Sequence, residues 1–132
     1  MTTLLDTHAW LWWVTADKRL SHRAATAIRR SMSGHDLWIS MISVWEVARK
    51  VEKGQLTLDR PVDHWLEQAI APQGLGVWEI TRPILVESCA LPQPFHGDPA
   101  DQIIVATARV HGAMVVTRDE RIREYSHVRS AW

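Results

Sequence analysis

The chain has 132 residues, a length that suits one domain of ordinary size and leaves no room for two. Hydrophobic residues make up 46% of it, enough for a folded core, yet no apolar run is long enough to span a membrane. Fifteen basic residues balance fifteen acidic ones, so the net charge by itself does not indicate nucleic-acid binding.

Apolar spacing and capping residues predict strands that alternate with helices along the chain. The first half predicts a strand at residues 2–5, helices at 8–14 and 22–32, a strand at 37–39 and a helix at 43–53 that Ser43 opens. The second half predicts a helix from Pro61, a strand at 76–80, helices at 82–90 and 99–111, a strand at 113–117, a short helix from about Glu120 and a candidate edge strand at 127–132.

The clearest of these elements is the helix at residues 99–111. Asp98 is suited to cap it, Pro99 takes its first position and Gly112 follows its end. It is apolar nearly all round, which is typical of a central buried helix. The alternation of strands and helices predicts an α/β domain that spans residues 1–132, with a mainly parallel sheet and helices on both faces.

Acidic residues follow the predicted strands and begin the predicted helices. Asp6 and Asp119 come directly after strands, Glu46 lies early in the helix from Ser43, and Asp98 and Asp101 begin the helix at 99–111. The carboxyl ends of parallel strands share one edge of a sheet, where ligands bind. The sequence therefore predicts that these acids lie near one another.

Helix capping is the competing explanation, because Asp is a preferred N-cap residue and an acid in the first turn complements the helix dipole. For any one of these acids taken alone, capping is the stronger reading. Glu46 lies three residues beyond Ser43, so these two could also form a capping box.

Convergence of several carboxylates would need a compensating cation, because each like-charged pair at about 4 Å costs roughly 4 kcal/mol at an effective dielectric of about 20. Oxygen ligands favour Mg²⁺ or Mn²⁺, and the seven histidines show neither an HxH nor an HExxH zinc-type spacing.

Four segments resemble the PIN-domain family, specifically the VapC-type toxins of toxin–antitoxin pairs. They are Leu4-Leu5-Asp6-Thr7-His8, Ser43-Val44-Trp45-Glu46-Val47-Ala48 with Lys50, His96-Gly97-Asp98-Pro99-Ala100-Asp101 with the run Ile103 to Ala108, and Val116-Thr117-Arg118-Asp119. Their order and spacing cover nearly the whole chain. The resemblance implies a three-layer α/β/α sandwich with a short, mainly parallel central sheet.

The resemblance also implies the site residues. Asp6, Glu46, Asp101 and Asp119 would form the catalytic metal site for Mg²⁺, with Mn²⁺ as a substitute. Thr7, Ser43 and Thr117 would orient carboxylates or waters. Asp98 would either assist the site or only cap its helix, and Arg118 would either contact a phosphate or lie exposed.

The implied activity is metal-dependent endoribonuclease cleavage by an activated water, leaving a 5′ phosphate and a 3′ hydroxyl. The implied partners are an RNA substrate, a VapB-type antitoxin and a second copy of the chain. There is no DNA-reading element and no membrane segment. The absence of a signal peptide, together with a single cysteine, Cys89, favours the cytoplasm.

Other functions with an acidic pocket remain as alternatives. A metal-dependent phosphatase commonly needs a second Asp two residues after the first-strand Asp, where this chain has His8. A signalling receiver domain needs a pair of adjacent acids after the first strand, which the chain lacks. A catalytically silent PIN fold that serves as a binding module is the non-enzymatic alternative.

Overall fold

The computed structural model describes all 132 residues. The strands are β1 (Thr3–Leu5), β2 (Leu37–Ser40), β3 (Leu75–Trp78), β4 (Met114–Val116) and β5 (Ser130–Ala131). The helices are α1 (Thr7–Val14), α2 (His22–Ser33), α3 (Met41–Glu52), α4 (Val62–Ala69), α5 (Arg82–Cys89), α6 (Pro99–His111) and α7 (Glu120–Arg123). None of the helices has the length and apolar character needed to cross a membrane.

The five strands form one sheet in the order β3-β2-β1-β4-β5, and every neighbouring pair is parallel. The prediction of a mainly parallel sheet is confirmed, and the tail supplies the edge strand β5. The central strand, β1, carries Asp6 immediately after its last residue.

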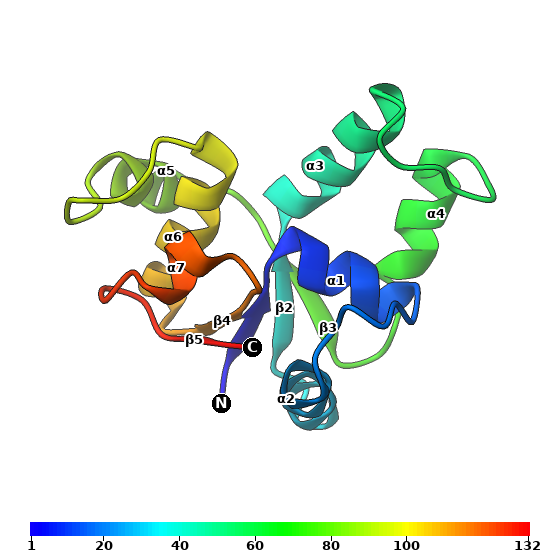
Figure 1. Cartoon of the computed structure of the whole chain (residues 1–132), viewed down its shortest axis with the longest axis horizontal. Coiled ribbons are helices and arrows are strands. Elements are labelled where there is room, and N and C mark those ends of the chain that lie inside the picture. The colour runs from blue at the N-terminus through cyan, green and yellow to red at the C-terminus, as the bar shows by residue number, and fades with distance from the viewer.

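Helices cover both faces of this sheet, which confirms the three-layer sandwich (Figure 1). Leu5 faces a core shared with α1, α2, α3 and α4, whereas its neighbour Leu4 faces a second core shared with α5, α6 and α7. The change of side between adjacent residues follows from the two-residue period of a strand.

Helix α6 matches its prediction from Pro99 to His111. Asp98 caps it through the amide of Asp101, and Gly112 ends it in the left-handed conformation with φ of 66°. Residues 104–108 are buried as expected, although Val110 near the C-terminus is 44% exposed.

The predicted start of α3 at Ser43 is wrong. The helix begins at Met41, and the Oγ of Ser40 accepts a hydrogen bond from the amide of Ile42. Ser43 is therefore inside the first turn and fully buried, so it does not form a capping box with Glu46.

Four helix N-termini meet at the carboxyl edge of the sheet (Figure 1). Helices α1, α3 and α7 follow β1, β2 and β4 with at most three residues between them, and α6 runs back along the sheet to end just before β4. This connectivity places the starts of all four helices around the end of β1.

Candidate active site

Asp6 is the most deeply placed acid at this edge, with 6% of its surface exposed. Its Oδ1 accepts a hydrogen bond from the amide of Thr7 at 2.8 Å, and its Oδ2 accepts one from the Thr117 hydroxyl at 2.7 Å. Both donors are neutral. Burial raises the pKa of Asp6, although the hydrogen bonds from Thr117 and Thr7 oppose that rise.

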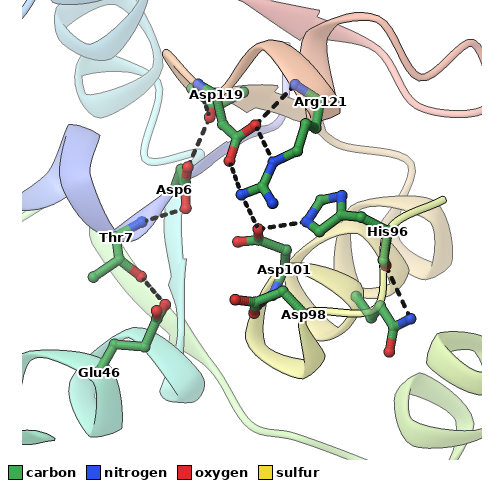
Figure 2. Close-up of polar contacts among 10 residues, drawn as sticks. Asp6, Thr7, Glu46, His96, Asp98, Asp101, Asp119 and Arg121 are labelled. Carbon is green, nitrogen blue, oxygen red and sulfur yellow. Dashed lines mark hydrogen bonds and ion pairs between the residues drawn. The ribbon is translucent and has the colours of Figure 1, made fainter.

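Glu46 is connected to Asp6 through Thr7 (Figure 2). The Thr7 hydroxyl donates to Glu46 Oε1 at 2.5 Å, and its oxygen lies 2.8 Å from Ser43 Oγ. The Thr7 hydroxyl has a single proton, which it donates in the hydrogen bond to Glu46 when Glu46 is ionised. The Ser43 hydroxyl must then be the donor in its hydrogen bond with Thr7. Burial is the main cause that raises the pKa of Glu46, and the charges of nearby acids add to it.

Asp101 projects into the same space from the first turn of α6. Its Oδ2 lies 2.7 Å from Nε2 of His96, and its own amide donates to Oδ1 of Asp98 at 3.1 Å. Burial, followed by the charges of Asp6, Asp98 and Asp119, raises the pKa of Asp101 to about 6, against the opposing hydrogen bond from His96.

Asp119 differs from the other three acids because its pKa is lowered rather than raised. Partial burial opposes its ionisation, but hydrogen bonds from Arg121 outweigh that effect and lower its pKa. The Arg121 guanidinium lies 2.9 Å from Asp119 Oδ2 and also 3.5 Å from Asp101 Oδ2, so it stands between the two carboxylates (Figure 2).

The four predicted acids therefore face one region, linked by short contacts. Asp119 joins Asp6 through Thr117, whose Oγ1 accepts from the Asp119 amide at 3.0 Å while donating to Asp6. Of the three hydroxyl residues named from the sequence, Thr7 and Thr117 donate to carboxylates of the site and Ser43 hydrogen-bonds Thr7.

Two residues of this region were not predicted from the sequence, namely His96 and Arg121. His96 comes from the Pro-containing loop before α6, and Nδ1 of its half-buried ring has no hydrogen-bond partner. The sequence signal was the proximity of the His to the Asp-Pro-x-Asp segment. Arg121 lies two residues beyond Asp119, and no motif in the sequence marks it as a partner of the acids.

The side chains of the two remaining predicted residues, Asp98 and Arg118, make no hydrogen bond to the carboxylates of the four acids. Asp98 is exposed and caps α6, which is the simpler of the two roles considered for it. Arg118 is exposed, and its guanidinium carbon lies 5.8 Å from the ring centroid of Trp12, so in this structure it does not contact the acids.

The chemistry of these side chains fits a divalent cation. Asp6 is a buried carboxylate and Glu46 and Asp101 are half-buried ones, all three have raised pKa values, and carboxylate oxygens are the ligands that Mg²⁺ and Mn²⁺ take. As arranged here, no three Asp, Glu, His or Cys side chains are close enough to share one ion. Binding would therefore require the carboxylates to move together and Arg121 to move away from Asp101.

A protein-family model described as PIN domain matches residues 3–128 of the chain. The chain is 38% identical over 128 residues to Ribonuclease VapC22 of Mycobacterium tuberculosis, an alignment that covers 97% of this chain and 95% of the relative.

Solved structures of similar fold include two complexes with DNA. VapBC2 from Rickettsia felis, bound to a DNA fragment from its promoter, matches with a TM-score of 0.74 and 14% identity, covering 99% of this chain and 98% of that one. DNA-bound VapBC from Salmonella typhimurium matches with a TM-score of 0.70 and 20% identity, covering 99% and 97%.

Proposed function

The chain belongs to the PIN-domain family, and on that premise we propose that it is a metal-dependent endoribonuclease and the toxin of a VapBC-type toxin–antitoxin pair. The observation that carries the proposal is the set of four acids at the carboxyl edge of the sheet, three of them with raised pKa values. The 38% identity to a protein named as a ribonuclease supports the choice of RNA as substrate.

Mg²⁺, or Mn²⁺ in its place, would be held by Asp6 and Asp101, with Glu46 and Asp119 completing the site directly or through water. When bound, such an ion lowers the pKa of a coordinated water and balances negative charge on the phosphate. Magnesium fits because all four side chains offer hard oxygen ligands.

The protein's own residues would prepare this site before RNA arrives. The hydroxyls of Thr117 and Thr7 donate to the carboxylates of Asp6 and Glu46 and so restrain them, and His96 restrains Asp101. Side chains that are already restrained by packing and hydrogen bonds lose less freedom when they bind an ion, so a closing movement of these carboxylates would complete the site.

Arg121 would contact protein carboxylates in the metal-free protein and an RNA phosphate in the metal-bound one. In the structure it balances Asp101 and Asp119, and its side chain is 59% exposed. Once a metal ion takes over those carboxylates, the guanidinium is free to contact an RNA phosphate, for which its paired donors are suited. The N-termini of α1, α3, α6 and α7 would add positive potential at the same edge.

The partners we propose are an RNA substrate, a VapB-type antitoxin and a second copy of this chain. The matched structures from Rickettsia felis and Salmonella typhimurium are VapBC complexes bound to DNA, which supports a VapB-type protein partner for this chain. Exposed apolar side chains of α5, namely Leu85 and Val86, are available for a protein interface.

The test is cleavage of pooled, end-labelled cellular RNA by the purified chain, with Mg²⁺, with EDTA, and in the variants Asp6→Asn and Asp101→Asn. We expect discrete fragments that require both the metal and each acid, while both variants keep their fold by circular dichroism. Exposed Asp63→Asn, in the first turn of α4, is the matched control and should cleave normally.

A catalytically silent PIN fold is the second candidate, and the position of Arg121 between Asp101 and Asp119 is the observation that favours it. In a silent protein the guanidinium would be the permanent countercharge. Absence of both cleavage and calorimetric Mg²⁺ binding would support this alternative and reject the nuclease proposal.

A further inference from the structure

A pocket of about 390 Å³ lies beside the acids, between the loop before α6 and the segment that follows α7. Its lining includes Phe95, His96, Arg121, Tyr125 and His127. This size falls within the range of about 300–1,000 Å³ that is typical of small-molecule sites. Four of these five side chains are aromatic rings, and the fifth is a planar cation.

The rings form a continuous wall. The centroid of Phe95 lies 4.3 Å from that of His96 and 4.6 Å from that of Tyr125, and Tyr125 lies 5.3 Å from His127. Tyr125 is buried, whereas Phe95 is half-buried and His127 is exposed. Phe95 and His127 are therefore the rings most accessible to a ligand.

Hydrogen bonds fix this wall at both ends. The Tyr125 hydroxyl donates to the carbonyl of Pro92 at 2.6 Å, which ties the tail to the loop. Nη1 of Arg109 donates to the carbonyl of His127 at 2.6 Å, which holds the backbone there. A flat ligand would enter a preformed site with little ordering cost.

The pocket and the candidate active site share two side chains. His96 lines the pocket and has its Nε2 2.7 Å from Asp101 Oδ2, and Arg121 lines it while contacting Asp101 and Asp119. A group in the pocket is thus separated from the acids by a single layer of side chains. Figure 2 shows that the side chains of His96 and Arg121 both reach the carboxylate of Asp101.

We propose that this pocket binds one nucleobase of single-stranded RNA next to the phosphate that is cleaved, and so contributes to the choice of cleavage site. Single-stranded RNA is recognised by stacking of bases on aromatic side chains and arginine planes, the two kinds of surface present here. A base on Phe95 and His127 would place its phosphate near Arg121. This inference rests on the proposed ribonuclease function.

The test uses a fluorescein-labelled eight-nucleotide RNA that spans a mapped cleavage site, with binding measured by anisotropy in EDTA so that no cleavage occurs. A series of the same RNA carries one abasic residue, moved along it a position at a time. The wild-type chain is compared with Phe95→Leu and His127→Ala, and with His64→Ala on α4, across the sheet, as the matched control.

We expect one abasic position to weaken binding to the wild-type chain and to His64→Ala by about tenfold, as for loss of one stacked base. In Phe95→Leu or His127→Ala the intact RNA should already bind weakly, and the same abasic position should add less than a twofold loss. Leucine keeps the apolar packing of Phe95, and unchanged thermal unfolding of His127→Ala excludes misfolding as the cause.

Equal losses at every abasic position in the wild type and in both variants would overturn the base pocket while leaving ribonuclease activity intact. If the variants lose affinity for an antitoxin but not for RNA, the pocket is a protein-docking site and the inference is wrong. If the wild-type chain neither binds nor cleaves any RNA, the proposed function itself fails.

Discussion

The carboxylate of Asp101 lies in a position where its negative charge is unfavourable. Its side chain is 14% exposed, and its pKa of about 6 lies above the ordinary value of 3.8. Between these two values the folded chain holds a proton that the unfolded chain has lost, so stability falls as the pH rises through this window. Above pH 6 the ionised group destabilises the metal-free fold by up to about 3 kcal/mol.

Asp101→Asn should therefore stabilise the metal-free protein while removing activity. At pH 7.5 we expect its free energy of unfolding in urea to exceed that of the wild type by about 1–3 kcal/mol, and at pH 4 most of this gain should disappear. Asp63→Asn, at an exposed acid in the first turn of α4, is the control and should change stability little at either pH. An equal gain at both pH values would contradict burial of an ionised Asp101.

The hydrogen bond from Thr117 to Asp6 is fully buried, so removing its donor has a direct cost. We expect Thr117→Val to lower the free energy of unfolding by about 1–3 kcal/mol at pH 7.5, because the buried carboxylate loses a donor. RNA cleavage should fall with it. Thr117→Ser keeps the hydroxyl and should retain cleavage, at a cost of about 1 kcal/mol or less for the lost methyl group. Equal loss of cleavage in both variants would show that the hydroxyl does not orient Asp6.

At the level of the elements, residue pattern predicts which segments are helices or strands better than where they begin. Helix α6 was predicted to the residue because three signals agree, namely Asp98 as a cap, Pro99 at the first position and Gly112 after the end. Helix α3 was misplaced by two residues because Ser40 and Ser43 are equally good capping residues. Sheet pairing selects between them, since Ser40 pairs with Trp78 of β3 and so ends β2.

The two glycines that close α2 and α6 look alike in sequence but differ in backbone geometry. Gly112 has φ of 66°, whereas Gly34 has φ of −86°, and a Cβ at Gly112 would meet no atom within 4 Å. Gly112→Ala should therefore cost about 1–2 kcal/mol from backbone conformation alone. Gly34→Ala should be neutral or slightly stabilising. Urea unfolding of the two variants measures the difference, and equal effects would contradict the left-handed end of α6.

At the scale of the whole molecule, topology made the acidic edge predictable. A parallel sheet brings the ends of β1 and β4 together, and with them Asp6 and Asp119. The partners of Asp101 were not predictable, because Arg121 reaches Asp101 across 20 residues and His96 belongs to an irregular loop. Such contacts depend on how α6, α7 and the loop pack, which periodicity does not encode.

The site joins the two helical layers, so a bound cation should stabilise the whole molecule. Asp6 precedes α1 and Glu46 lies in α3, and both of these helices cover one face of the sheet. Asp101 lies in α6 and Asp119 precedes α7, and these helices cover the other face. An ion held by both pairs of acids would bind the folded chain and not the unfolded one. It would raise the free energy of unfolding by about 2.7 kcal/mol when the free ion is present at 100 times its Kd.

For a chain of this length we expect Mn²⁺ to raise the unfolding temperature at pH 7.5 by about 5–10 °C. The rise should be smaller at pH 5, where protons compete for Asp101, and absent in Asp6→Asn, while Asp63→Asn should behave as the wild type. The same rise in Asp6→Asn would mean that the ion binds elsewhere, and that the acids at the end of β1 do not form the metal site.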